Sequence, residues 1–288
     1  MPFILKLRHT GWLMAMLATA SASGASAQTY RQAVADTQPI ASFELDTPNA
    51  PSSNGLYTTN WQNVTSGPGV PLTGITGNNS AFFDGTGSTS QITTSLAGST
   101  PGRGSIIAWI NAAMLPSEAG RIFYIAGESQ FANDFDFQYD QQDKLSFCVG
   151  AGECLVNQPT SNFVGDWHMV AAAYDGTRGG GLDTQSLYID GLLVAGRAGD
   201  FSDAGHGNPF TIGYSSVFGG REFSGLIDEV SVYDRELNAS EVAALYAARL
   251  TGAASAVPET ATWAMMIAGF GAIGGSLRQR RRATAALA

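Results

Sequence analysis

The fold is decided by the stretch FSGLIDEVSVYDRELNASEVAALY, residues 223–246, which places a β-strand directly before a short helix. The apolar and β-branched residues of GLIDEVSVY are typical of a strand. Asn238 and Glu241 then stand three residues apart, which is the spacing of a capping box at a helix N-terminus. Val242 and Leu245 follow at helical spacing, so the sequence predicts one short helix that closes the domain.

Further strand signals recur at short intervals before this stretch. They are SIIAWI at 105–110, WHMVAAAY at 167–174, SLYIDGLLVAG at 186–196 and FTIGY at 210–214. The first is apolar on both faces, as in a strand covered on both sides, and Asp190-Gly191 suits a tight hairpin turn. Because helix formers are scarce while Gly, Ser and Thr are abundant, the sequence predicts an all-β domain of many short strands.

The stretch NDFDFQYD, residues 133–140, alternates strictly between two kinds of side chain. The set that faces one way on a strand consists of Asp134, Asp136, Gln138 and Asp140. The aromatic residues between them face the other way. One interpretation is a half-buried strand with a solvated face. The other is an acidic strand on a ligand-binding face, and the pattern alone does not separate the two.

Residues 1–27 have the organisation of a secretory signal peptide. Two basic residues near the start precede an apolar run at 11–20, and small residues then lead to an Ala-x-Ala motif that ends at Ala27. We therefore expect cleavage between Ala27 and Gln28 and export of the remaining chain.

The chain ends with an apolar segment at 261–277 and a basic cluster at 278–282. The fifteen uncharged residues at 263–277 would span about 22 Å as a helix, which is short of the roughly 30 Å of bilayer hydrocarbon. Because the segment is this short, we expect a transient membrane association rather than a permanent anchor. Positive residues stay on the cytoplasmic side, so the arginines are expected to stop transfer there.

The body between these ends is strongly acidic. Residues 28–256 contain 23 Asp and Glu against 9 Lys and Arg, which gives a net charge of −14. Such a surface is unsuited to nucleic acid, which binds basic patches. Neutral glycans and divalent cations stay compatible with it.

Cys148 and Cys154 are the two cysteines of the chain, and they enclose a five-residue turn within FCVGAGECLV. An exported chain meets an oxidising environment, and a hairpin of this size brings the two sulfurs together. We therefore expect a disulfide. A metal site is not expected, because no second pair of Cys or His accompanies them.

The order of the motifs resembles a known family. ASFELDTPN, SAFFDGTGSTSQITTSL, GSIIAWINAA, the strands quoted above and the closing strand and helix follow one another across residues 41–248. This succession is similar to the laminin-G-like members of the concanavalin A-like lectin/glucanase superfamily. The resemblance implies a two-sheet antiparallel jelly-roll sandwich at 28–250, followed by a linker at 251–256. It also implies that the first strand, at 43–46, lies beside the last, at 225–233.

The same resemblance implies one structural calcium ion near the seam between the first and last strands. Asp46 and Asp228 would approach each other there, with Asp84 as a third candidate ligand, since calcium prefers carboxylate and carbonyl oxygens. Alternatively, Asp46 begins a turn and Asp228 accepts hydrogen bonds from backbone N–H groups. Asp84 and the glycine after it also suit a turn.

The tail at 257–288 is similar to a PEP-CTERM sorting signal. Its motif residues are Val257, Pro258, Glu259 and Trp263, and Thr260 stands where the usual motif has a second proline. The basic end contains Arg278, Arg280, Arg281 and Arg282. The resemblance implies an exosortase-type processing protease as a partner. It also implies a membrane-tethered precursor and a mature protein at the cell surface or in the extracellular matrix, in the context of exopolysaccharide production.

Glucanases of this superfamily use two carboxylates that alternate on one strand. Asp228 and Glu229 are adjacent, so they are expected on opposite faces of a strand, and the 133–140 stretch lacks Glu. His168 is interpreted as a packed or edge residue of a strand, and His206 as an exposed loop residue or a ligand contact. We therefore expect no catalysis.

The sequence thus predicts an exported, non-catalytic surface or matrix protein that binds extracellular polysaccharide or another surface protein, in adhesion or biofilm structure. The candidate sugar contacts, each of which equally fits the core, are Tyr57, Trp61, Phe131, Tyr214 and Phe218. One alternative is a polysaccharide hydrolase or lyase of the same fold. Another is a purely structural matrix component.

Overall fold

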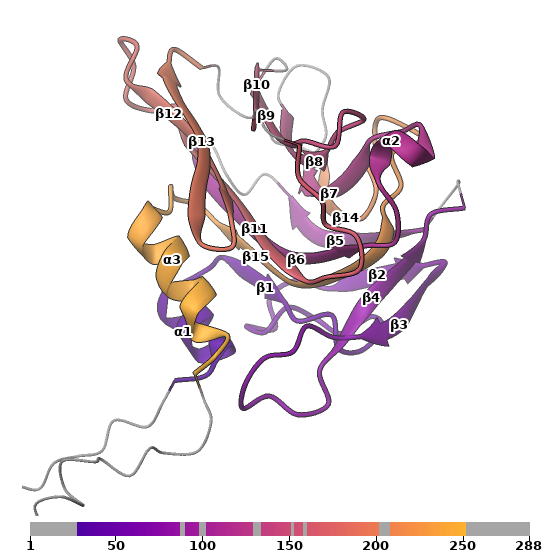
Figure 1. The fold of residues 1–288 in the computed structure, drawn as a ribbon. Coiled ribbons are helices and arrows are strands. Elements are labelled where there is room, and N and C mark those ends of the chain that lie inside the picture. Colours follow the sequence, from indigo (N-terminus) through magenta and orange to yellow (C-terminus); the bar gives the residue numbers. More distant parts are fainter. Residues whose placement is uncertain are drawn as a thin grey trace, which may run out of the picture. The chain divides into compact units, whose positions relative to one another are not determined.

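Two antiparallel β-sheets pack face to face in the computed structural model of the chain (Figure 1). The structure describes residues 28–86, 90–97, 102–128, 134–150, 153–157, 160–201 and 208–251. These residues belong to one unit, Ala27–Ala254. The signal peptide and the sorting tail lie outside the described residues and stay predictions. Within the described ranges, no helix is long and apolar enough to cross a membrane.

The strands divide into a sheet of eight and a sheet of seven. The first contains β1 (Ala41–Phe43), β3 (Val64–Pro68), β4 (Asn79–Asp84), β6 (Arg103–Ala112), β11 (His168–Asp175), β12 (Asp183–Ile189), β13 (Leu192–Gly199) and β15 (Ser224–Tyr233). The second contains β2 (Thr59–Gln62), β5 (Gln91–Ala97), β7 (Phe123–Glu128), β8 (Asp134–Tyr139), β9 (Leu145–Gly150), β10 (Glu153–Val156) and β14 (Pro209–Ile212). Their orders are β13-β12-β11-β6-β15-β4-β3, with β1 also on β15, and β10-β9-β8-β7-β14-β5-β2. The predicted two-sheet antiparallel sandwich is confirmed.

The first and last strands lie side by side, as expected, although the first strand is at 41–43 rather than at 43–46. β1 pairs with β15 through Ala41 opposite Val232 and Phe43 opposite Val230. β15 also pairs with β4 and β6. Segments from the two ends of the domain therefore meet in the middle of the eight-stranded sheet.

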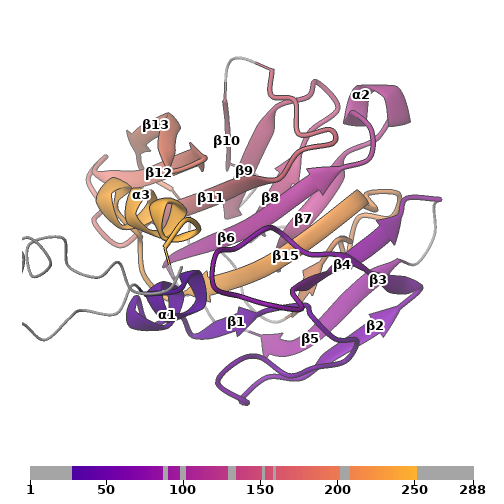
Figure 2. The same ribbon diagram turned by 60° about the horizontal axis from the view of Figure 1, so that its bottom comes forward.

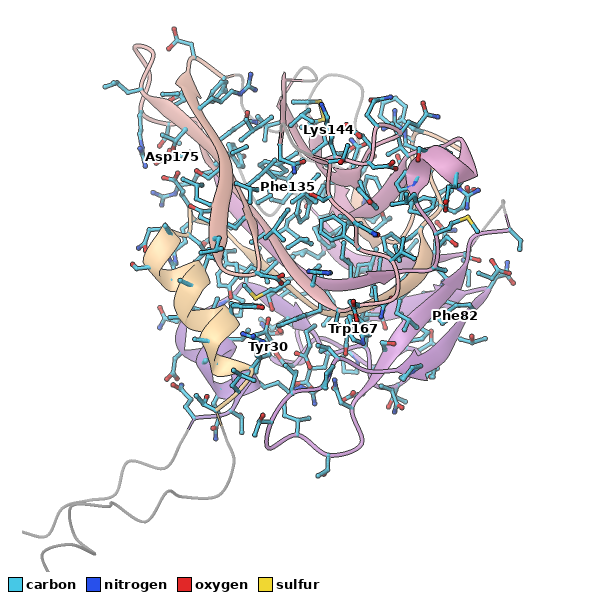
Figure 3. All side chains as sticks on the ribbon, viewed as in Figure 1. Tyr30, Phe82, Phe135, Lys144, Trp167 and Asp175 are labelled. Carbon is cyan, nitrogen blue, oxygen red and sulfur yellow. A yellow bond between two sulfur atoms is a disulfide. The ribbon has the colours of Figure 1, made fainter. Side chains whose placement is uncertain are left out.

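The main core fills the space between the sheets. On β8, Phe135, Phe137 and Tyr139 point inward and are fully buried, as the alternation at 133–140 predicts. The ring of Phe135, labelled in Figure 3, lies edge-on to Phe147 with 5.5 Å between the ring centroids. Burial of each such side chain stabilises the fold by roughly 1.5–3 kcal/mol.

Two helices cover the outer face of the eight-stranded sheet and create a second core there (Figure 2). They are α1 (Tyr30–Asp36) and α3 (Ala239–Ala248). Trp109 of β6 lies beneath them, where it stacks on Tyr246 with 5.9 Å between the ring centroids. The domain therefore has three layers, namely helices, the eight-stranded sheet and the seven-stranded sheet.

Of these helices, α3 has the predicted capping box, in which Asn238 Oδ1 accepts from the N–H of Glu241 and Glu241 accepts from the N–H of Asn238. The sequence prediction misses α1 and the single turn α2 (Pro116–Ala119). The reason is length, because helices of seven and four residues are too short to establish an apolar period.

The first and last described residues meet on the helix side of the domain. Thr251 Oγ1 donates a hydrogen bond to the carbonyl of Gln28. Gln28 Nε2 in turn donates to Asp36 Oδ2 over 2.6 Å, at the end of α1. The described domain is thus entered and left at neighbouring points.

Candidate functional site

A row of residues crosses all seven strands of the second sheet, on the face that points away from the first sheet. Successive register pairs give its order from one edge to the other as Asn60, Thr93, Thr211, Gly127, Asp136, Cys148 and Cys154. Directly paired residues share a face of a sheet, and the inward positions of β8 belong to the core aromatics. We call this set the transverse row; it forms a mainly polar line across the outer face.

Asp136 occupies the middle of the transverse row and has an exposed fraction of 0%. Tyr124 Oη donates to Asp136 Oδ1 over 2.8 Å. Gly127 leaves room for this pair, because a Cβ there would lie 2.7 Å from Tyr124 Oη. Gln138, two positions along the same face, is 5% exposed. The polar face at these two positions is therefore buried rather than solvated.

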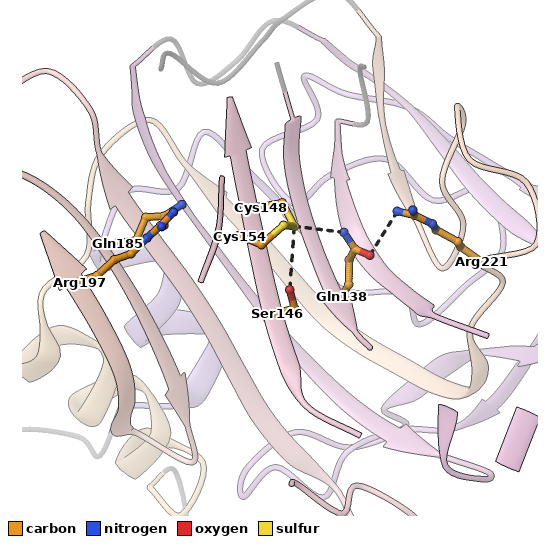
Figure 4. Close-up of a disulfide and its surroundings, with 7 residues drawn as sticks. All are labelled: Gln138, Ser146, Cys148, Cys154, Gln185, Arg197 and Arg221. Atoms are coloured by element: carbon orange, nitrogen blue, oxygen red, sulfur yellow. Dashed lines mark hydrogen bonds between the residues drawn. A yellow bond between two sulfur atoms is a disulfide. The ribbon is translucent and has the colours of Figure 1, made fainter. Parts of the chain in front are cut away.

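The predicted disulfide between Cys148 and Cys154 is confirmed. It joins β9 to the edge strand β10 at one end of the transverse row (Figure 4). Gln138 Nε2 donates to Cys148 Sγ over 3.6 Å, and Ser146 Oγ lies 3.9 Å from the same sulfur. The bond therefore fixes the edge of the sheet beside the polar residues of β8 and β9.

Residues 213–222, which we call the covering segment, connect β14 to β15 and contact outward-facing side chains of the seven-stranded sheet. At the start of the segment, the carbonyl of Tyr214 accepts a hydrogen bond from Thr211 Oγ1 over 2.6 Å. At its end, the carbonyl of Arg221 accepts from the N–H of Tyr124 over 2.9 Å. Both donors belong to strands of the sheet, so the segment is attached at its two ends.

The covering segment carries three half-buried side chains, Tyr214, Phe218 and Arg221, of which Phe218 and Arg221 contact each other. The guanidinium carbon of Arg221 lies 4.2 Å from the centroid of the Phe218 ring. Arg221 Nη1 donates to Gln138 Oε1 over 3.3 Å (Figure 4). Aromatic, guanidinium and amide groups thus meet beside the transverse row, and together they suit the binding of a polar, ring-shaped ligand.

The other aromatic candidates do not join this group. Tyr57 and Trp61 are half-buried and pack against the main core beside the opposite edge strand, β2. Phe131 lies outside the described residues. Sequence spacing does not separate these two sets, because both lie near strand ends.

The remaining polar candidates have ordinary structural roles where they are described. His168 Nδ1 lies 2.8 Å from Asp190 Oδ2, and this hydrogen bond raises the pKa of His168, which agrees with a packed strand residue. Asp140 Oδ1 accepts from backbone N–H groups of the turn after β8. His206 and the side chain of Asp134 lie outside the description.

The three predicted calcium ligands each bind a different neighbour. Asp46 Oδ2 lies 2.8 Å from Arg31 Nη1. Asp228 Oδ2 accepts from the N–H of Val70 over 2.9 Å. Asp84 accepts hydrogen bonds within its own turn, which lower its pKa. In the part of the chain that the structure covers, no group of three or more His, Cys, Asp or Glu side chains is placed to hold a metal ion.

The cation at the seam is Arg31, which projects from α1. Its guanidinium nitrogens lie 3.1 Å from a carboxylate oxygen of Glu44, 2.8 Å from Asp46 and 2.6 Å from Glu229. We call these four residues the Arg31 cluster. A calcium ion bound by Asp46 would compete with Arg31 for the same carboxylate, so the described residues do not fit the ion at this position, and the calcium ion stays a prediction.

A family model for the concanavalin A-like lectin/glucanases superfamily matches residues 84–243. The chain belongs to this superfamily. No curated protein matches its sequence. The family match covers the strands of both sheets from the end of β4 onward, including the transverse row from β5 to β10 and the whole covering segment.

Solved structures share the superfamily fold at low sequence identity. Domain 4 of AbnA, a GH43 extracellular arabinanase from Geobacillus stearothermophilus in complex with arabinotriose, is 17% identical with a TM-score of 0.54, over 77% of this chain and 99% of that one. The botulinum neurotoxin type G receptor binding domain is 16% identical, with a TM-score of 0.53. Trypanosoma rangeli sialidase is also 16% identical, with a TM-score of 0.51. These two matches cover 73% of this chain but 51% and 33% of the other chains, and they show the fold alone.

Asp228 and Glu229 are the adjacent carboxylates that were compared with the catalytic pair of the superfamily's glucanases. Their positions differ from the prediction. A β-bulge between Asp228 and Ser231 interrupts the register with β6, and Glu229 has φ +50°. Asp228 binds Val70 and Glu229 binds Arg31 of α1, so both carboxylates lie on the helix side. The prediction of opposite faces is therefore wrong, because the extra residue of a bulge breaks strict alternation. Both side chains are buried and closed to a polysaccharide.

Burial changes the protonation of this pair. It raises the pKa of Glu229 to about 8, although the guanidinium of Arg31 opposes the shift. Burial and the neighbouring Glu229 also raise the pKa of Asp228 well above its ordinary value. The pair therefore retains protons at pH values where exposed carboxyl groups have lost them.

Proposed function

We propose that this chain is an exported, non-catalytic surface or matrix protein that binds a glycan on the outer face of its seven-stranded sheet. The observation that carries the proposal is the stacked pair of Phe218 and Arg221 beside Gln138 of β8. Aromatic rings cover apolar faces of sugars, while amide and guanidinium groups hydrogen-bond their hydroxyls. The shared fold of the AbnA domain, whose structure contains arabinotriose, supports a sugar ligand.

The absence of glycosidase activity is part of the proposal. Most glycoside hydrolases need two carboxyl groups that flank the scissile bond. Asp136 is the single carboxylate of the transverse row, and it is buried against Tyr124. A polysaccharide hydrolase or lyase is the rival function, and turnover of a polysaccharide that is lost in Asp136→Asn would establish it instead.

Phe218→Ala is expected to weaken glycan binding about tenfold, or about 1.4 kcal/mol. The substitution removes an aromatic contact and the ring on which Arg221 stacks. A glycan array identifies the ligand for the purified chain, and titration calorimetry then compares the variants.

Phe82→Ala is the matched control for this experiment. Phe82 is 38% exposed but belongs to β4 of the other sheet (Figure 3), so its loss should leave binding unchanged. Equal losses in both variants, or none in Phe218→Ala, would contradict the proposed site. A blank array for the wild-type chain would favour a purely structural matrix component.

Export and processing by an exosortase-type membrane protease complete the proposal. The disulfide supports an oxidising destination. Mass spectrometry of protein recovered from the cell surface and the medium is expected to find Gln28 as the first residue and the tail at 257–288 removed. Recovery of an uncut chain with reduced thiols from the cytoplasm would contradict both expectations.

A further inference from the structure

Arg221 is half-buried but has no acidic partner within the part of the chain that the structure describes. A guanidinium carries five N–H donors, and among the described residues Arg221 uses one of them, in the hydrogen bond to Gln138 Oε1 at 3.3 Å. Phe218 orients the plane of the group from 4.2 Å. The hydrogen bond from the N–H of Tyr124 to the Arg221 carbonyl fixes the backbone. The guanidinium group is therefore held in place, and most of its N–H donors make no hydrogen bond to the described residues.

Other arginines of the domain differ from Arg221 in this respect. Among the described ion pairs, a carboxylate oxygen lies within 4.0 Å of Arg31, Arg121, Arg178 and Arg235. Arg249 also stacks on an aromatic ring, 3.6 Å from the centroid of Tyr246, but its Nη1 donates to the Tyr246 carbonyl at the C-terminal end of α3. Among the described residues, Arg221 binds neither a carboxylate nor a helix end, although the chain has 24 Asp and Glu against 15 Lys and Arg.

We propose that Arg221 binds a carboxylate group of the ligand, so that the glycan is an acidic polysaccharide with uronate residues. This step rests on the proposed function and names the substrate class of the same site. A guanidinium binds a carboxylate through two parallel hydrogen bonds, which a sugar hydroxyl does not offer. The stacked ring keeps the guanidinium oriented before the ligand arrives.

The surroundings of Arg221 favour an anion over a neutral sugar. Burying a charged group costs free energy unless an oppositely charged group pairs with it. Gln138 and Ser146, paired on the neighbouring outer face, are uncharged and do not compete for the guanidinium as a carboxylate would. The acidic remainder of the domain repels polyanions in general, so an acidic polysaccharide would bind at this face and not over the whole surface.

The test compares polysaccharides in two matched forms, native and with their carboxyl groups reduced to alcohols. The probes are polygalacturonate, alginate, hyaluronan and the exopolysaccharide of the producing cells, each titrated against the purified chain. A native form is expected to bind at least about tenfold more tightly than its reduced form. Arg221→Gln is expected to abolish this preference, and Arg221→Lys to retain part of it, since lysine keeps the charge but not the planar fork.

Arg249→Gln is the matched control, because it also removes an arginine stacked on an aromatic ring but on the helix side; the preference should stay unchanged. Thermal unfolding of each variant checks that it is folded. Equal binding of native and reduced forms, or an unchanged preference in Arg221→Gln, would overturn this inference and leave the proposed glycan binding intact. Binding of no polymer in either form would overturn both.

Discussion

Replacing Arg31 by alanine is expected to lower the free energy of unfolding by about 3–5 kcal/mol at about pH 9. The substitution leaves Glu229, which is 1% exposed, without the guanidinium that binds it over 2.6 Å. Glu44 and Asp46 lose the same partner, so three carboxylates face one another with no cation among them. Denaturant unfolding followed by tryptophan fluorescence measures the loss.

Arg178→Ala is the matched control for this prediction. Arg178 also lies against two carboxylates, those of Asp175 and Glu236, but its side chain is 42% exposed. Exposed ion pairs contribute about 0–1 kcal/mol, so this variant should lose much less stability. Losses of similar size in Arg31→Ala and Arg178→Ala would show that burial of the Arg31 cluster does not increase its contribution to the free energy of unfolding.

The loss in Arg31→Ala should shrink below about pH 8, where Glu229 accepts a proton. The pKa of Glu229 rises from 4.5 to about 8 on folding. The folded protein thus binds a proton that the unfolded chain has released, and the stability from this group, fully present below about pH 4.5, is lost as the pH rises to about 8. Glu229→Gln should flatten this part of the stability profile. A slope equal to that of the wild type would contradict the assignment.

Gly213→Ala is expected to destabilise the domain by about 2–4 kcal/mol. Gly213, at the start of the covering segment, has φ +77°, and a Cβ there would lie 2.1 Å from the Phe83 ring. Phe83 is fully buried in the main core, so relief of the clash must displace either the core or the segment. Chemical denaturation measures the loss, and weaker glycan binding should accompany it because Tyr214 is the next residue.

Gly179→Ala separates the two causes of this effect. Gly179 also has a positive φ, +61°, but a Cβ there would meet no atom within 4 Å. Its substitution should cost about 1–2 kcal/mol from backbone conformation alone. If Gly213→Ala costs no more than Gly179→Ala, the Phe83 ring yields freely and the covering segment is not positioned by the core.

The features that sequence reasoning predicts correctly depend on few neighbouring residues. The alternation at 133–140, the pairing of Cys148 with Cys154 and the turn at Asp190-Gly191, where φ is +51° and +80°, are of this kind. The order of the motifs adds the pairing of the first strand with the last, because a family resemblance carries long-range information that spacing lacks.

The features that sequence reasoning misses depend on residues far apart in the chain. Arg31 and Glu229 are separated by 198 positions, and Arg221 and Gln138 by 83. No local pattern reveals that an arginine occupies the place where a cation was expected, or that Arg221 of the covering segment reaches Gln138 of β8. A bulge is equally invisible to alternation, which is why the prediction for Asp228 failed.

The hydrogen bond between Thr251 and Gln28 has a consequence for how the domain is presented. Both residues belong to the helix layer, whereas the transverse row lies beyond the far sheet of the sandwich. A linker fused to either residue would therefore join the domain on its helix side. If that linker were attached to a surface, the face that carries Arg221 would point away from the surface. Display on beads through Gln28 or through Thr251 should leave this face equally open to a polymer in solution.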